Sequence, residues 1–500
     1  MKVALVLKRL EVGGIENLVL RISEHLSNDH EVCIICTEGN GEWDPIAENL
    51  GLRLKKFYIW DFKDPVTFIE TIAEFIIDES FAAIYINDTI IGSAVAGLVD
   101  SKTKKITVLH AIDTISISVA VSNRENMDGF IAISPRIKRI LDNDETENSV
   151  LVPNGISNDF FGKMSDRVEQ DSELKLLYCG RLSHSDKGVL FLPKLLELFS
   201  SHSDEKFSLT IVGDGPARSE LERMIYEKKL NDFVTIKGSL KKDNIIQEMK
   251  EAHFLIFPSL SEGFGLSIIE AQAMGCIPVA FLIDGVTDYL IKDNINGLLC
   301  EYGKIESMYE RVSDTFKNKQ KMNELNKAAI MNAKQYKIEN TANEWIKRID
   351  KMPLKTIKYD TEKIQDNILG VLSFAADFET KCAKQKWLNN FYNKEEGNLV
   401  VLRKREIRNV VIFGTMHMSY FIYIDLLKEN YNVVGFIDNN KVLPASINHI
   451  PIYDETWLEK ETSSYDSVIV SIESSSSKIV KQRLKENFPG KYIFEWKELR

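Results

Sequence analysis

The chain has 500 residues, a length that allows roughly two to four domains with sizeable cores. Hydrophobic residues make up 44% and charged residues 27%, which is ordinary for a soluble globular protein. A net charge of -11 argues against a general nucleic-acid binder, which normally carries a basic patch. A local basic face for an anionic membrane or acceptor stays open.

The N-terminus, residues 1–9, is typical of a short strand ending in charge and lacks the apolar core of a signal peptide. No later apolar run approaches a membrane span, so we expect a cytoplasmic protein, with peripheral contact to the inner face of the cell membrane left open. Cys33 and Cys36 form a C-x-x-C pair inside an expected strand, where residues three apart point to opposite faces. We interpret them as core residues instead of metal or redox ligands.

Short apolar strands alternate with helical stretches along most of the chain, which indicates parallel sheets covered by helices. The pattern predicts a first domain over 1–155 and, after a Pro-Asn-Gly turn, a second over 156–350. A helical connector is expected over 351–405, and a smaller α/β unit over 406–500. The expected strands are 3–7, 32–36, 82–86, 106–110, 129–133 and 150–152, then 174–179, 209–212, 234–237, 254–257, 278–281 and 297–300.

Two glutamates, Glu262 and Glu270, are the most informative residues. Residues 253–257 predict a buried strand, 258–265 a loop and 266–274 a helix. Free amides and the positive dipole end at such a helix start suit a diphosphate, and ionised carboxylates accept hydrogen bonds from hydroxyl groups. Either glutamate alone is more often structural, but the pair in this setting indicates a nucleotide-sugar site.

Further candidates follow other expected strands of the second domain. Arg181 and Lys187 lie between an expected strand and an expected helix. Arginine offers a planar fork of hydrogen-bond donors and lysine a mobile point charge, and both suit a leaving diphosphate. Each cation alone would be interpreted as a solvated loop residue. Gly213 and Gly215 flank Asp214 before a proline and predict a turn that lets backbone approach a nucleotide.

The first domain contributes a weaker set. Gly13 and Gly14 separate the first strand from the first helix and would allow close approach of backbone to a ligand. His110 ends an expected strand on the side of the sheet where parallel α/β proteins bind ligands. Asp113 could assist it or cap a helix, and Ser134-Pro-Arg136 is as typical of a capped helix start as of a site.

Together these motifs resemble the retaining nucleotide-sugar glycosyltransferases of family four, or glycosyl transferases group 1, which have the GT-B fold. The resemblance rests on Gly-Gly-x-Glu, Gly-Arg followed by Lys-Gly, Gly-x-Gly-Pro, and two glutamates with seven residues between them. It implies two facing Rossmann-like domains, with a tail over 303–350 that crosses back under the first. It also implies a catalytic set of His110, Arg181, Lys187 and Glu262, and a donor-binding set of Gly13, Gly14, Gly213, Gly215, Ser239, Leu240, Gly263, Phe264, Gly265, Leu266, Ser267 and Glu270.

The resemblance also assigns roles. His110 and Glu262 would position the sugar, Glu270 would hold the ribose, and Arg181 and Lys187 would neutralise the leaving diphosphate. Ser239 and Leu240 would contact the base through backbone groups, so the base cannot be identified. The eight histidines are dispersed, and we expect metal-independent transfer without a cofactor.

Residues 410–417 of the last unit resemble the start of a Rossmann-like domain, similar to the N-terminal domain of bacterial sugar O-acyltransferases. A dinucleotide site needs several glycines after the strand, and here only Gly414 remains, with Asp438 at a plausible ribose position. We therefore favour a docking, oligomerisation or regulatory module over a cofactor site.

The sequence thus predicts a retaining glycosyltransferase that moves a sugar from a UDP- or GDP-sugar to a glycan, lipid-linked or protein acceptor in bacterial surface polysaccharide or glycoconjugate synthesis. The alternatives are a non-catalytic GT-B scaffold subunit and a GT-B sugar epimerase.

Overall fold

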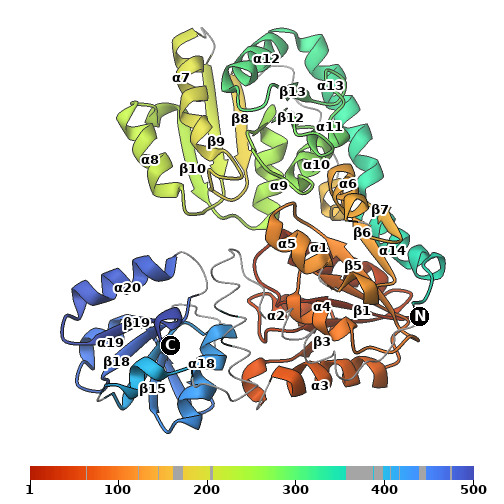
Figure 1. The fold of residues 1–500 in the computed structure, drawn as a ribbon. Coiled ribbons are helices and arrows are strands. Elements are labelled where there is room, and N and C mark those ends of the chain that lie inside the picture. Colours follow the sequence, from red (N-terminus) through yellow and green to blue (C-terminus); the bar gives the residue numbers. More distant parts are fainter. Residues whose placement is uncertain are drawn as a thin grey trace.

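A computed structural model describes residues 1–62, 65–121, 123–144, 146–161, 173–202, 206–355, 384, 387, 398–405, 407–415, 417–438, 446–472 and 476–499. Three sheet-containing units follow one another from the N- to the C-terminus (Figure 1). The predicted helical connector over 351–405, with its polar stretch at 393–397, lies almost entirely outside the described residues.

The first unit is a parallel sheet of seven strands in the order β3-β2-β1-β4-β5-β6-β7. Its central strands are buried along nearly their whole length, as expected for a sheet with helices on both faces. The strands are β1 (Lys2–Leu7), β2 (Glu31–Cys36), β3 (Arg53–Lys56), β4 (Ala83–Asn87), β5 (Lys104–Leu109), β6 (Gly129–Ala132) and β7 (Ser149–Leu151). The helices are α1 (Gly14–Leu26), α2 (Asp44–Asn49), α3 (Pro65–Asp78), α4 (Ile90–Ala96), α5 (Thr114–Val121) and α6 (Pro135–Asn143).

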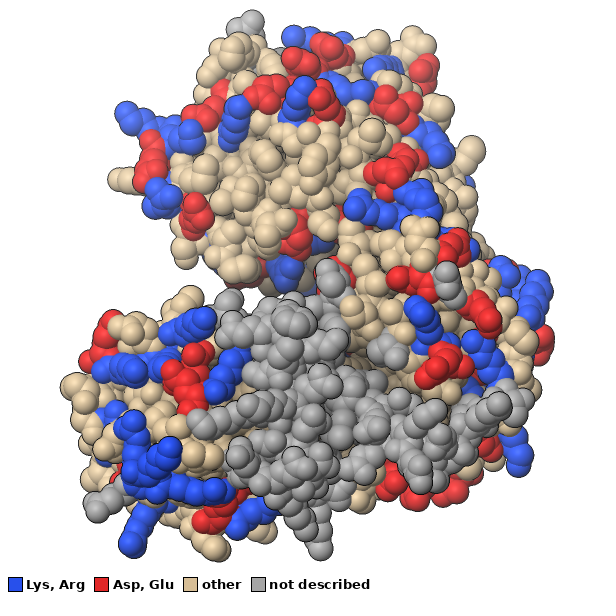
Figure 2. Space-filling model, viewed as in Figure 1, with Lys and Arg blue, Asp and Glu red and all other residues tan. Residues whose placement is uncertain are grey.

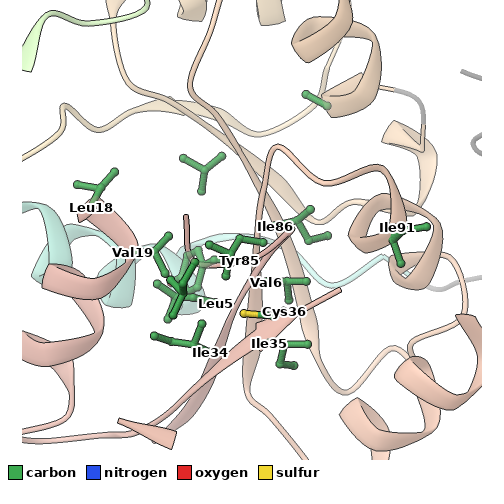
Figure 3. Close-up of a cluster of buried hydrophobic side chains, with 14 of the residues drawn as sticks. Leu5, Val6, Leu18, Val19, Ile34, Ile35, Cys36, Tyr85, Ile86 and Ile91 are labelled. Atoms are coloured by element: carbon green, nitrogen blue, oxygen red, sulfur yellow. The ribbon is translucent and has the colours of Figure 1, made fainter. Parts of the chain in front are cut away.

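The sequence missed β3, because its residues Arg-Leu-Lys-Lys lack the apolar run of a buried strand and it lies at the sheet edge. The core between β1, β2, β4 and the helices α1 and α4 is filled mainly by aliphatic side chains and includes Tyr85 and Cys36 (Figure 3). Burial raises the pKa of the Cys33 thiol to about 11 and that of Cys36 to about 12. Both thiols therefore stay protonated at neutral pH and are core residues.

The second unit is a parallel sheet of six strands in the order β10-β9-β8-β11-β12-β13. The predicted pair of Rossmann-like domains is confirmed. The strands are β8 (Glu173–Cys179), β9 (Lys206–Val212), β10 (Val234–Gly238), β11 (Phe254–Phe257), β12 (Ile277–Phe281) and β13 (Leu298–Cys300). The helices are α7 (Leu192–His202), α8 (Arg218–Glu227), α9 (Lys242–Glu251), α10 (Leu266–Ala273), α11 (Thr287–Leu290), α12 (Ile305–Lys317) and α13 (Lys319–Ala333).

Helix α14 (Ile338–Lys351) leaves the second unit and packs on the first, beside α1 (Figure 1). Its Trp345 ring stacks on Tyr85 of β4 with centroids 4.7 Å apart, and the Tyr85 hydroxyl donates to the Trp345 carbonyl over 2.6 Å. The tail thus packs against α1 and β4 of the first unit and joins the two units.

The third unit has a six-stranded sheet in the order β16-β17-β15-β14-β18-β19, parallel except for the β16–β17 pair. The strands are β14 (Asn409–Phe413), β15 (Asn432–Ile437), β16 (Ser446–Ile447), β17 (Ile450–Tyr453), β18 (Ser467–Val470) and β19 (Tyr492–Glu495). The helices are α17 (Val400–Arg403), α18 (His417–Lys428), α19 (Thr456–Lys460) and α20 (Ser476–Asn487). This confirms a third α/β unit.

An aromatic contact joins the third unit to the first. The Trp60 ring, just after β3, lies 5.4 Å from Tyr420 and 5.1 Å from Phe436, measured between centroids. The Tyr420 hydroxyl donates to the carbonyl of Phe62 over 3.0 Å. Trp60 is buried in a hydrophobic core that contains residues of both units. The third unit is therefore packed against the first, in addition to being covalently connected to it.

Candidate active site

A cavity of about 420 Å³ lies between the first and second units. Its walls come from residues that follow strands of both sheets and from the starts of α1 and α10. The carboxyl ends of parallel strands are the edge at which α/β proteins bind ligands. The lining residues are Gly14, Ile15, Asn17, His110, Ile133, Asn154, Cys179, Gly180, Arg181, Lys187, Phe257, Glu262, Gly263, Phe264, Gly265, Leu266, Ser267 and Glu270.

Lys187 and Glu262 form an ion pair inside this cavity. The Lys187 Nζ atom lies 2.6 Å from Glu262 Oε1, and the Glu262 side chain is only 8% exposed. The two residues follow β8 and β11, which are neighbours in the sheet. The N–H groups of Leu260 and Ser261 donate to the Asp186 carbonyl and tie the two loops together. The pair is therefore assembled by the sheet order and held by backbone hydrogen bonds.

Arg181 lies at the rim of the same cavity. Its guanidinium donates to the Asp186 carboxylate over 2.7 Å, and its side chain is 63% exposed. Gly188, in the left-handed region with φ +62°, packs against Pro258, and a Cβ there would overlap the Pro258 carbonyl oxygen. Only glycine fits this turn, which places Lys187 beside the neighbouring loop. Each of the two predicted phosphate-binding cations is thus paired with a carboxylate, which an incoming diphosphate would have to replace.

The start of helix α10 faces the cavity through Gly265, Leu266 and Ser267. Gly265 is the residue before the helix and has φ +102°, a conformation that favours glycine. It provides no side-chain cap, so the first amides of the helix are available to an anion. This is the arrangement predicted for binding a diphosphate.

Glu270 reaches the cavity from the second turn of α10. Burial raises the pKa of its carboxyl to about 7. Within the described ranges its side chain has no hydrogen-bond partner, whereas Glu262 is paired with Lys187. A half-buried carboxyl without a partner is costly, and hydroxyl groups of a ligand would satisfy it.

His110 directly follows β5, one residue beyond the end of the strand, and its ring is almost fully buried. Its Nε2 atom lies 2.9 Å from Asn87 Oδ1, at the end of the adjacent strand β4. The Asn87 amide nitrogen donates to the carbonyls of Val6 and Tyr85, which fixes Oδ1 as the acceptor. His110 Nε2–H is therefore the donor and Nδ1 carries a free lone pair. Burial lowers the pKa of His110 to about 3, so the ring is neutral at physiological pH.

The first and second units also meet at His110. A Cβ on Gly263 would overlap the His110 carbonyl oxygen. The absence of a side chain at Gly263 therefore lets the loop of the second unit touch the first.

Asn154 is a lining residue that the sequence analysis did not select. Its side chain is 4% exposed and its Oδ1 atom is buried without a hydrogen-bond partner. It lies in the Pro-Asn-Gly turn, which we interpreted only as the crossover between domains. The signal in the sequence was the turn itself, and it gave no indication that the amide points into a cavity.

Five predicted donor-binding residues are not among the residues that line this cavity. Ser239 and Leu240 follow β10, the edge strand of the second sheet, two strands away from β8. The other three are glycines that shape turns: a Cβ would overlap the Glu16 carboxylate at Gly13, the Gly180 carbonyl at Gly213 and the Leu182 carbonyl at Gly215. Contact of these five residues with the donor stays a prediction.

Two weaker candidates are helix caps. Asp113 Oδ1 accepts the N–H of Ser116 over 3.0 Å at the start of α5. Ser134 Oγ accepts the N–H of Ile137 at the start of α6. The neighbouring Arg136 contacts the second unit through its N–H, which donates to the Gly285 carbonyl. Their geometry is explained by local structure.

No group of three or more His, Cys, Asp or Glu side chains in the described part of the chain could hold a metal ion. One Asp-x-Asp triplet is present, Asp142-Asn-Asp144, at the end of α6. The Asp142 carboxylate accepts hydrogen bonds from Lys138 over 2.6 Å and from Ser149. It is therefore occupied by contacts within the first unit. Among the helices of the described residues, none has both the length and the apolarity to cross a bilayer.

Comparison with protein families gives two adjoining matches. The model described as Glycosyltransferase Family 4 matches residues 12–160, and the model described as Glycosyl transferases group 1 matches residues 162–335. The boundary between them follows the first sheet and lies a few residues after the Pro-Asn-Gly turn. Together these two matches span well over half of the chain and end before the third unit.

Curated relatives agree with these matches. An uncharacterised glycosyltransferase of Methanocaldococcus jannaschii is 25% identical over 238 residues, which cover 46% of this chain and 62% of the relative. The poly(glycerol-phosphate) alpha-glucosyltransferase of Bacillus subtilis is 26% identical over 259 residues, which cover 51% of this chain and 38% of the relative. The matched segments thus span less than two thirds of the length of these relatives.

Solved structures share the fold. Anabaena HepE in complex with UDP and glucose superposes with a TM-score of 0.60 at 16% identity, covering 70% of this chain and all of that chain. Sucrose-phosphate synthase from Thermosynechococcus elongatus gives a TM-score of 0.58 at 18% identity, covering 70% of this chain and 98% of that chain. At these identities the likeness shows the fold alone.

Two facing Rossmann-like sheets with a cavity at their carboxyl edges define a GT-B protein. With both family models matched in order along the first two units, the chain belongs to the family 4, group 1 glycosyltransferases.

Proposed function

We propose that the protein transfers a sugar from a nucleotide-sugar donor, a UDP- or GDP-sugar, to a glycan, lipid-linked or protein acceptor, with retention of anomeric configuration. The observation that carries this proposal is the convergence of Lys187, Glu262, Glu270 and the open start of α10 on one cavity. The names of the relatives and of the HepE complex, which contains UDP and glucose, support a sugar donor of this kind.

In the proposed mechanism the diphosphate binds at the amides of α10, with Lys187 and Arg181 turning from their carboxylate partners to the phosphates. The sugar then lies near His110, whose free Nδ1 accepts a hydrogen bond from a hydroxyl group. Glu262, once released by Lys187, accepts from a second hydroxyl. As the glycosidic bond to the phosphate breaks, the cations and helix amides stabilise the growing negative charge.

The acceptor hydroxyl attacks from the face that the diphosphate leaves, through an oxocarbenium-like state. Its proton passes to the leaving phosphate oxygen, so a separate basic side chain is unnecessary. Charge neutralisation by Arg181, Lys187 and the helix amides makes metal-independent transfer part of the proposal. A cytoplasmic location, with a product that serves surface polysaccharide or glycoconjugate synthesis, also belongs to it.

The test is release of nucleoside diphosphate from a panel of UDP- and GDP-sugars by the purified full chain. We expect slow hydrolysis of one donor, and we expect Lys187→Ala to reduce it by roughly 10²–10³-fold, the effect of removing one electrostatic stabiliser. Lys327→Ala, which changes an exposed lysine of α13, is the matched control. Epimerisation of the sugar without release would favour the epimerase. The same turnover in wild type and Lys187→Ala would contradict the assignment.

A further inference from the structure

A second charged cavity, of about 360 Å³, lies on the third unit. Four cations line it, Arg405, Lys481, Lys485 and Lys491, with one acid, Glu498, among the described lining residues. The whole chain has the opposite balance, with 74 acidic against 63 basic residues. Figure 2 shows Lys and Arg side chains gathered on the third unit. The cations therefore form a local positive site in an acidic protein.

Two of these cations are held in place by uncharged groups. The Arg405 guanidinium lies 4.8 Å from the ring centroid of Tyr492 and 5.4 Å from that of Phe494, both on β19. The Lys491 ammonium donates to the Tyr465 carbonyl and lies 4.7 Å from the Tyr465 ring. These contacts hold the side chains through uncharged groups, which lowers the cost of ordering them around an anion. Lys491 also interacts electrostatically with Asp466, whereas the rings that Arg405 contacts are uncharged.

The other two cations lie one helical turn apart on α20. Lys481 is paired with Glu498. Lys485, four residues later on the same helix face, is exposed and forms no ion pair with any residue that the structure describes. One acid against four cations leaves three positive charges unbalanced among the lining residues.

We propose that this cavity binds a phosphate ester, independently of the nucleotide-sugar cavity. A phosphate group offers several oxygen acceptors and negative charge, which match the fork of Arg405 and the ammonium groups of Lys485 and Lys491. The rings of Tyr492 and Phe494 form a wall for the organic part of the ester. An anionic phospholipid headgroup and a soluble phosphate ester share this chemistry, and the two sources can be separated by experiment.

The experiment uses the full chain and two probes. Co-sedimentation measures binding to phosphatidylcholine vesicles with and without phosphatidylglycerol, and calorimetry measures binding of glycerol 3-phosphate. We expect binding to one of the probes, weakened by salt, and a loss of about tenfold or more in Lys485→Glu. Each cation near an anionic surface contributes roughly fivefold, and this substitution changes the charge by two. Lys460→Glu, on α19 of the same unit, makes the same charge change outside the cavity and should bind as wild type.

Each outcome decides the proposal. Binding to phosphatidylglycerol vesicles alone assigns a lipid headgroup, and binding of glycerol 3-phosphate assigns a soluble ester. An equal loss in Lys460→Glu would mean that net charge, not the cavity, attracts the anion, and would overturn the proposal. Failure to bind either probe would also overturn it. Nucleoside diphosphate release should be unchanged in Lys485→Glu, which shows that the variant is folded and that the two cavities act separately.

Discussion

Replacing Glu270 with glutamine removes a carboxyl group that burial makes costly to ionise. Its pKa is about 7 in the folded protein against 4.5 for an unperturbed glutamate. Between these values the unfolded chain releases the proton while the folded chain keeps it, so stability falls as pH rises and the cost is fully present above pH 7. At 1.36 kcal/mol per pKa unit, the shift corresponds to at most about 3 kcal/mol. Glu270→Gln should therefore stabilise the unliganded protein at pH 8 and leave it nearly unchanged at pH 4.5.

The assay is thermal unfolding of wild type and Glu270→Gln across this pH range, without nucleotide. For a domain of this size, about 3 kcal/mol corresponds to a rise of roughly 6–12 °C in the transition that contains α10. The same variant should bind nucleoside diphosphates more weakly, because the contact that we predict between Glu270 and the ribose loses its carboxylate. Glu310→Gln, an exposed glutamate of α12, is the control and should show neither effect. A destabilised Glu270→Gln at pH 8, or a difference that does not change with pH, would refute the reasoning.

Three further predictions concern other contacts. Asn87→Asp places a carboxylate against His110 Nε2 and should raise the pKa of His110 well above 3, observed by NMR titration; a ring that stays neutral at pH 5 would contradict the hydrogen bond. Gly263→Ala should push the two units apart at the His110 carbonyl and reduce transfer while nucleotide binding persists; unchanged transfer would show that the contact is not needed. Trp60→Ala should weaken the docking of the third unit by about 3–5 kcal/mol, seen as faster proteolysis between the units; an unchanged digest would exclude this role.

The fold was largely predictable because its strands are apolar runs separated by turn residues. Phe254–Phe257 is an example: four buried apolar residues followed by Pro258 gave both the strand and the loop after it. β3 was missed because its polar residues at a sheet edge carry no such signal. The edge strands β16 and β19 of the third unit were not predicted either. Docking of the third unit through Trp60 was not predictable, because no pattern in the sequence indicates that Trp60 contacts Tyr420 and Phe436.

The candidate site was predictable where sheet order alone brings residues together. Lys187 and Glu262 follow neighbouring parallel strands, so their loops meet at one edge. The neutral state of His110 was not predictable, because it depends on burial and on Asn87 at the end of the adjacent strand. The unpartnered amide oxygen of Asn154 was not predictable either, because the Pro-Asn-Gly sequence is already accounted for by the turn that it forms. The features that could not be predicted depend on burial in the folded protein, which a single sequence does not give.

The most direct test of the central claim, that the cavity between the first two units holds a nucleotide sugar, is calorimetric titration of UDP and GDP. We expect one of them to bind the wild type and Glu310→Gln equally, and to bind Lys187→Ala and Glu270→Gln at least tenfold more weakly. Equal affinity for all four proteins, or no binding of either nucleotide to the wild type, would contradict the account.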